Sequence, residues 1–155
     1  MAFNIQSPEF WQGERIPVRF TCDGEDLSPE LSWEDPPEGT KSFTLIAEDP
    51  DAPMGTFVHW VLYDIPAGLK RLERGEGNKA DPGQGMKHGT TGFGRIGYGG
   101  PCPPKGHGDH RYSFILKALD VETLGLGAGA TKADVEASME GHVLGEASLM
   151  GIYGR

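Results

Sequence analysis

The sequence predicts a single, mostly β domain over residues 1–155, built as an antiparallel β-sandwich with a peripheral C-terminal helix. A length of 155 residues suits one domain. The 24 glycines and 12 prolines favour a turn-rich, strand-rich fold over a helical bundle. Candidate strands also follow one another with a single late helix, whereas parallel βαβ units need helices between their strands.

Strand patterns fill the first half of the chain. Residues 17–22 alternate between apolar and polar, and an acidic turn leads from them to a short strand that ends at Trp33. The segments 42–49 (SFTLIAED) and 56–65 (TFVHWVLYDI) are the strongest candidates; the second is rich in β-branched and aromatic residues. A turn and a short edge strand are expected within residues 66–72 (PAGLKRL).

The second half begins with an irregular region and contains the helix. Residues 75–108 hold half of the chain's 24 glycines, and a loop of this length inside a compact domain is usually functional or disordered. A third strong strand is expected over residues 111–120. The helix is expected over residues 131–145, with Asp134 completing a capping box, and a closing strand over residues 147–154. The apolar stripe of this helix consists of Val135, Met139, Val143 and Leu144.

Charge and hydropathy exclude several classes of protein. The net charge is −9, and no cluster of Lys and Arg is present, so neither nucleic acid nor an anionic membrane surface is an expected partner. No apolar run has the length that a transmembrane segment needs. The N-terminal residues lack a basic start followed by an apolar core, so a cytoplasmic location is expected.

The two cysteines, Cys22 and Cys102, are expected to be free thiols, because the cytosol is reducing; a disulfide between them stays open as an alternative. A free Cys102 raises the question of nucleophilic catalysis, with His59 or His110 and Asp49 completing a Cys-His-Asp set. No local signature of a cysteine protease surrounds it. A small buried apolar residue is the commoner role of such a cysteine.

Three places concentrate polar residues that the core of a sandwich does not require. They are the segment DPDAP (Asp49–Pro53), His59 within an apolar strand, and the loop over residues 97–110 (GYGGPCPPKGHGDH). DPDAP is also typical of a turn, and His59 could be a core histidine hydrogen-bonded to a backbone carbonyl, so a purely structural role stays open for both. If the strands on either side of DPDAPMG pair, Asp49 and His59 can come close.

The end of the glycine-rich loop supplies two more histidines. His107 and His110 flank an aspartate and are metal-ligand types, but no recognised metal-binding spacing is present, so no metal is expected. On the strand that follows, His110 and Tyr112 share one face and look like donors aimed at a common ligand. Arg111 points the other way and is expected to pair with an acid such as Asp51.

Several of these motifs, taken in order, resemble the phosphatidylethanolamine-binding protein family, also called the Raf kinase inhibitor protein family. They are DPDAP, FVHWVLYDIP and GYGGPCPPKGHGDHRYSF, while TCDGEDLSPELSW and HVLGEASLMGIYGR resemble its bacterial and archaeal branch. The resemblance implies a β-sandwich with a small surface cavity. It also implies a binding protein without a cofactor, rather than an enzyme, whose ligand is a phosphate-type anion or a phospholipid headgroup such as phosphoethanolamine.

The resemblance also assigns residues to the cavity. Its ligand-binding residues would be Asp49, His59, Gly100, Pro101, Cys102, His110 and Tyr112, supported by Asp51, Pro53 and Arg111. The backbone N–H groups of Gly100 and Cys102 would be available to an anion, and an imidazole oriented by Asp49 would be favoured in its protonated form. Two departures from the animal members, Val58 in place of a histidine and the longer rim GGPCPP, bear on headgroup specificity.

Family members in eukaryotes regulate kinases or inhibit serine proteases, so the resemblance carries a second hypothesis. In it the protein is an inhibitor of other proteins, and the rim loop 97–110 is the contact surface. Bacterial relatives further suggest a homodimer. A small hydrolase that uses Cys102 is the third hypothesis.

Overall fold

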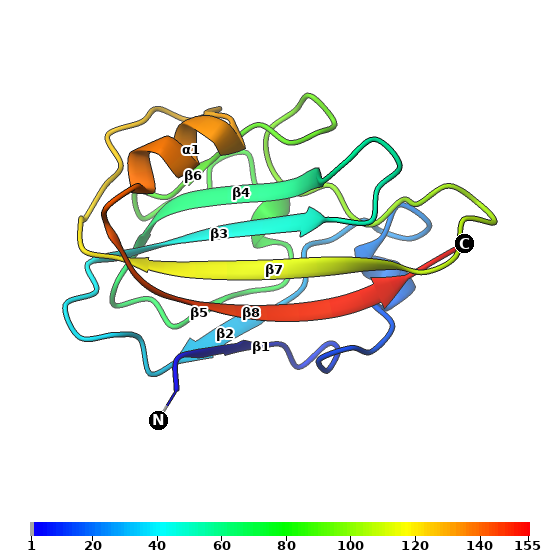
Figure 1. Ribbon diagram of the computed structural model, residues 1–155, viewed down its shortest axis with the longest axis horizontal. Coiled ribbons are helices and arrows are strands. Elements are labelled where there is room, and N and C mark those ends of the chain that lie inside the picture. The colour runs from blue at the N-terminus through cyan, green and yellow to red at the C-terminus, as the bar shows by residue number, and fades with distance from the viewer. Residues whose placement is uncertain (1) are drawn as a thin grey trace.

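Two antiparallel sheets face each other in the computed structural model, which describes residues 2–155 (Figure 1). The larger sheet has five strands in the order β6-β4-β3-β7-β8, and the smaller has three in the order β1-β2-β5. The fold class predicted from the sequence is therefore confirmed. The strands are β1 (Asn4–Gln6), β2 (Leu31–Glu34), β3 (Ser42–Asp49), β4 (Phe57–Pro66), β5 (Arg71–Leu72), β6 (Lys87–His88), β7 (His110–Leu119) and β8 (Val143–Tyr153).

The main core lies between the two sheets. Strand β3 is at the centre of the large sheet, and nearly all of its residues are buried because both faces are covered. Strand β7 instead alternates, and its buried residues Tyr112, Phe114, Leu116 and Ala118 face the small sheet. This agrees with the face predicted from the sequence. Each buried side chain of this size contributes roughly 1.5–3 kcal/mol relative to exposure.

A second, smaller core lies on the other face of the large sheet, under helix α1 (Lys132–Met139). Thr131 and Asp134 form the predicted capping box. The predicted end near Gly145 is wrong, because the helix stops at Met139 and Gly141 takes a left-handed conformation with φ of 83°. Val143 then begins β8 with an exposed side chain, so the last part of the predicted apolar stripe belongs to a strand.

The strand predicted over residues 17–22 is also wrong. A 3₁₀ helix (Val18–Phe20) occupies this segment. The hydroxyl and the backbone N–H of Thr21 both donate to the carbonyl of Val18, so local hydrogen bonds replace a strand ladder. Gly24 packs so closely on this turn that an added Cβ would lie 2.5 Å from the same carbonyl oxygen.

The two short strands β1 and β6 were not predicted, since three and two residues are too few to show a period. A second 3₁₀ helix (Glu76–Asn78) opens the glycine-rich region. Among the described residues, no helix has the length and apolar character needed to cross a membrane.

Candidate ligand-binding site

A cavity of about 370 Å³ opens at the end of the large sheet where β3 finishes and where β4 and β7 start. Because β3 is antiparallel to both of its neighbours, the C-terminal end of β3 and the N-terminal ends of β4 and β7 lie at the same end of the sheet. The residues lining the cavity are Asp49, Ala52, Pro53, Phe57, His59, Gly92, Phe93, Cys102, Pro103, Pro104, His110 and Tyr112.

A larger hollow of about 630 Å³ lies elsewhere, beside β1 and β8. Glu30 is the one titratable side chain among its lining residues. The smaller cavity gathers an aspartate, two histidines and a tyrosine instead, and such a concentration of titratable groups is typical of a functional site.

Asp49 and His110 form a buried pair on the cavity wall. The His110 Nδ1–H group donates to Asp49 Oδ2 over 2.6 Å, and both side chains are less than 5% exposed. The other carboxylate oxygen of Asp49 accepts the backbone N–H of Asp51 over 2.8 Å. The imidazole that Asp49 orients is therefore His110. Strands β3 and β4 do pair, and Asp49 and His59 line the same cavity as expected, but they share no hydrogen bond among the described residues.

His59 is held by the rim of the cavity instead. Its Nδ1 lies 2.7 Å from the carbonyl oxygen of Gly99, and a carbonyl can only accept, so Nδ1 carries the hydrogen. Burial lowers the pKa of His59, and the Gly99 carbonyl and the negative charge of Asp49 oppose this shift. The neutral ring then presents Nε2 as an acceptor, and protonation would turn it into a donor.

Tyr112 carries a polar group that the protein leaves unpaired. Its hydroxyl is buried and has no hydrogen-bond partner among residues 2–155. The ring is stacked on His110 at 6.3 Å between centroids and meets the edge of His59 at 5.2 Å. Burial is the first cause that raises the pKa of Tyr112, and the Asp49 carboxylate adds to it through its charge and as an acceptor near the hydroxyl. The two groups make no hydrogen bond of regular geometry, so the phenol stays protonated and can donate.

Two phenylalanines give the cavity an apolar wall that the sequence did not identify. The Phe57 and Phe93 rings meet edge to face at 4.8 Å, and each lies within 5.5 Å of the His59 ring. Phe57 could have been found, because it lies two residues before His59 and so on the same face of β4. Phe93 lies in the irregular region and gave no such signal.

Asp51 and Arg111 form the expected ion pair at the edge of the site. Two guanidinium nitrogens of Arg111 donate to the carboxylate over 2.9 and 2.7 Å, and the backbone N–H of Arg111 donates as well. These bonds with Arg111 lower the pKa of Asp51 to about 2. The pair does not line the cavity. It ties the turn after β3 to the start of β7, while Pro53 lines the cavity directly.

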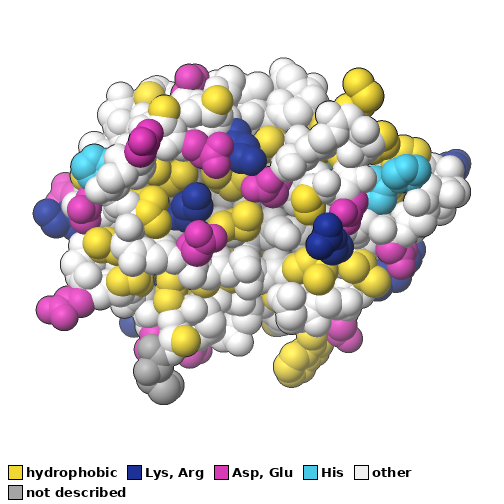
Figure 2. Space-filling view, in the orientation of Figure 1, with side chains coloured by type: hydrophobic (Ala, Val, Ile, Leu, Met, Phe, Trp, Pro, Cys, Tyr) yellow, Lys and Arg dark blue, Asp and Glu magenta, His cyan; other side chains and the backbone are white. Residues whose placement is uncertain are grey.

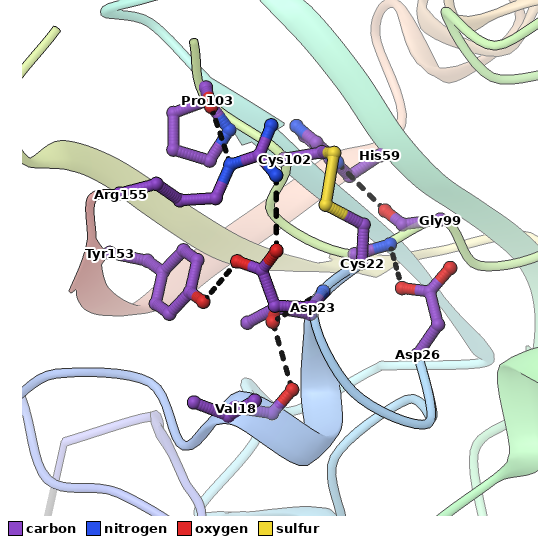
Figure 3. The surroundings of a disulfide bond; sticks show 12 residues. Val18, Cys22, Asp23, Asp26, His59, Gly99, Cys102, Pro103, Tyr153 and Arg155 are labelled. Atoms are coloured by element: carbon purple, nitrogen blue, oxygen red, sulfur yellow. Dashed lines mark hydrogen bonds and ion pairs between the residues drawn. A yellow bond between two sulfur atoms is a disulfide. The ribbon is translucent and has the colours of Figure 1, made fainter. Parts of the chain in front are cut away.

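Cys22 and Cys102 are joined in a disulfide, so the expectation of two free thiols is wrong (Figure 3). Their Cα atoms are 5.4 Å apart, and 80 residues separate them in the sequence. The bond links the turn after the first 3₁₀ helix to the rim of the cavity. A disulfide sulfur is not a thiolate, so the hydrolase hypothesis loses its nucleophile.

The rim differs from expectation in one further respect. The Gly100 N–H group donates to Asp26 Oδ1 over 2.8 Å, so it is not available to an anion. Gly100 packs on the 3₁₀ turn, where an added Cβ would lie 2.3 Å from the carbonyl oxygen of Phe20. The Pro101 carbonyl accepts the N–H of Cys22. Gly100 and Pro101 therefore hold the rim to the 3₁₀ turn and do not line the cavity. The next three residues of the predicted rim, Cys102, Pro103 and Pro104, do line it.

His107 lies beside the cavity, on the outer part of the rim loop. Its Nδ1 is 2.6 Å from Nε2 of His110, and the two rings meet edge to face at 4.8 Å. The residue is exposed, whereas His110 is 2% exposed. No group of three or more His, Cys, Asp or Glu side chains within residues 2–155 is arranged to hold a metal ion.

The surface around the sheet carries both signs of charge. Figure 2 shows acidic and basic side chains interspersed over the visible face, without a concentrated basic patch there. Histidine side-chain atoms reach the surface at the right-hand end of this view, the end at which the C-terminus lies in Figure 1. An anion would thus be attracted by local donors rather than by a broad positive field.

Comparison with known proteins finds a family model that matches nearly the whole chain. The model of the family described as "Phosphatidylethanolamine-binding protein" matches residues 6–154. The UPF0098 protein of Aquifex aeolicus is 55% identical over 151 residues, covering 97% of this chain and 88% of that protein.

Solved structures agree in fold. The crystal structure of Escherichia coli YbcL, described as a new member of the mammalian PEBP family, has a TM-score of 0.93 and 32% identity, with 100% of this chain and 99% of that chain covered. A carboxypeptidase Y inhibitor complexed with the cognate proteinase has a TM-score of 0.54 and 21% identity, covering 98% and 82%. This last likeness is one of fold alone.

Proposed function

Because the chain belongs to the phosphatidylethanolamine-binding protein family, we propose that it is a binding protein, not an enzyme, and that its cavity takes a small phosphate-type anion. The anion is either free phosphate or the phosphate of a headgroup such as phosphoethanolamine. The observation that carries this proposal is the buried, unpartnered hydroxyl of Tyr112 on the cavity wall. A buried polar group without a partner costs roughly 1–3 kcal/mol, and a ligand acceptor would remove that cost.

The remaining polar groups suit the same ligand. Tyr112 donates from one side, and His59 can donate from Nε2 once it is protonated. Because burial lowers the pKa of His59, this second donor forms only below the usual histidine range. Phosphate affinity should therefore rise as the pH falls. The rings of Phe57 and Phe93 offer a surface for the organic part of a phosphate ester.

A titration of the histidine and tyrosine side-chain NMR signals with phosphoethanolamine tests this proposal. We expect saturable shifts at His59 and Tyr112. The variant Tyr112→Phe removes one oxygen atom and should weaken binding about tenfold or more, since a hydrogen bond to a charged group contributes about 1.5–3 kcal/mol. His142→Ala is the matched control, because His142 forms an exposed pair with Asp120 remote from the cavity. Unchanged binding in Tyr112→Phe would contradict the assignment of the pocket.

A second candidate function is inhibition of another protein, such as a kinase or a serine protease, through the mouth of the cavity. It is favoured by two exposed apolar side chains, Phe93 (39%), which lines the cavity, and Met54 (99%), which follows the lining residue Pro53 in the sequence. An inhibition assay against a panel of serine proteases and kinases would test it. Inhibition that Met54→Ser abolishes would support a protein partner, and no inhibition by the wild-type protein would argue against one.

A further inference from the structure

Both ring nitrogens of His110 are engaged by other side chains of the protein. Nδ1 bonds to Asp49 Oδ2 and Nε2 bonds to Nδ1 of His107, each over 2.6 Å. The carboxylate can only accept, so the hydrogen of the first bond belongs to His110. The second bond has two forms. Either a protonated His110 donates Nε2–H to His107, or a neutral His110 accepts from His107.

In both forms an anion finds no free donor on His110. A phosphate oxygen can receive a hydrogen bond from this ring only if one of its two present partners leaves. Asp49 is 3% exposed and is also held by the backbone N–H of Asp51, so its departure would leave a charge buried without a partner. His107 is exposed and can turn into water.

We propose that His107 caps His110, so that it competes with the ligand for Nε2 and has to move aside before a phosphate group can use this histidine. This inference rests on the proposed function, because it concerns the same cavity. It makes His107 a residue that sets affinity without itself lining the cavity.

The loop around His107 is built in a way that allows this movement. Gly106 and Gly108 flank it, both with positive φ (79° and 89°), and a Cβ added at either would meet no atom within 4 Å. The Gly106 N–H group donates to the carbonyl of Arg155, and the His107 N–H group donates to Pro104. The backbone is therefore anchored at Gly106 and His107, while the imidazole itself is held by its bond to His110.

The size of the effect follows from that single bond. Removing the His107 side chain frees Nε2, so a protonated His110 can donate to the ligand without first giving up a hydrogen bond. A typical net hydrogen-bond contribution corresponds to about a two- to tenfold gain in phosphate affinity. His107→Asn should behave differently from His107→Ala. Its amide lies near the place of Nδ1 and can either accept from or donate to Nε2, so it should restore the wild-type affinity.

The test is a titration of wild type, His107→Ala, His107→Asn and the control His142→Ala with inorganic phosphate at a fixed pH, followed by the ¹⁵N signals of the histidine rings and the ring signals of Tyr112. We expect His107→Ala to bind about two to ten times more tightly than wild type, and the other two variants to match wild type. Without ligand, the His110 Nε2 signal should shift in His107→Ala and stay near its wild-type position in His107→Asn.

The outcomes separate this inference from the proposed function. If phosphate shifts His59 and Tyr112 with equal affinity in wild type and His107→Ala, the cavity binds anions and the cap is refuted. Weaker binding in His107→Ala would make His107 a direct ligand contact, which also refutes the cap. If phosphate shifts the cavity signals in none of the four proteins, the proposed function fails and the cap fails with it.

Discussion

Loss of the Cys22–Cys102 disulfide should destabilise the protein substantially, and through the unfolded chain more than through the folded one. The bond closes a loop of 80 residues. The chain-entropy relation for a loop of that length gives about 4.5 kcal/mol at 25 °C, and measured values are commonly smaller. We therefore expect the double variant Cys22→Ser/Cys102→Ser to lose about 2–4.5 kcal/mol of unfolding free energy.

The folded rim should change little in this variant, because other contacts hold it. The hydrogen bonds from Gly100 to Asp26 and from the Tyr98 hydroxyl to Phe20 remain, and so does the bond from Arg155 Nε to the Pro103 carbonyl. Phosphate affinity should accordingly stay within about twofold of wild type, since a change of that size corresponds to less than 0.5 kcal/mol.

Guanidinium unfolding with and without a thiol reductant measures the stability change. Wild type should fall to the stability of the double variant when it is reduced, and the double variant should not respond to the reductant. The denaturant slope should also rise on reduction, because a chain without the cross-link exposes more surface when it unfolds. A stability loss below about 0.5 kcal/mol would refute the reasoning. Faster hydrogen exchange confined to the rim would show instead that the bond acts on the folded state.

Two further predictions concern protonation. Burial is the main cause that lowers the pKa of both His59 and His88. Below the usual histidine pKa of about 6.5, the unfolded chain therefore binds more protons than the folded one, and the free energy of unfolding should fall from pH 7 to 5. Urea unfolding measures this decrease, which should be less steep in His88→Gln, and a flat profile would contradict the prediction. Bonds with Arg111 lower the pKa of Asp51 to about 2, so Arg111→Gln should return that pKa towards its ordinary value near 3.8. An NMR pH titration measures the value, and an unchanged pKa would show that the Arg111 side chain does not cause the shift.

The strands that build the cavity were predictable because their signals are local. The segment 42–49 was predicted with the bounds that β3 has, and β4 and β7 each differ from prediction by one residue at either end. The alternation of side chains along β7 also predicts that His110 and Tyr112 share one face, and both are buried on that face. These features depend on side-chain period and strand propensity, which a single sequence records.

The contacts between segments were less predictable. The strands on either side of Asp49 each carry a histidine, His59 on β4 and His110 on β7. Asp49 bonds to His110 rather than His59 because of the strand register and because the Gly99 carbonyl accepts the hydrogen bond of His59. The disulfide could not be predicted from the sequence, because the approach of Cys22 to Cys102 depends on how the rim folds back onto the turn after the first 3₁₀ helix. The end of the helix could not be predicted, because the apolar Val143 fits the helical pattern of the preceding residues and the start of a strand equally well.

The cavity is lined by residues from strands and by residues from a loop, and these two groups tolerate sequence change differently. Asp49, His110 and Tyr112 belong to hydrogen-bonded strands, where a shift of one residue would turn every side chain to the opposite face. The stretch from residue 103 to 109 belongs to a loop, where insertions cost little. Under the function proposed above, a change in this loop would alter which molecules the cavity admits while the strand residues keep their chemistry. An exchange of this loop between relatives would then transfer selectivity without rebuilding the fold.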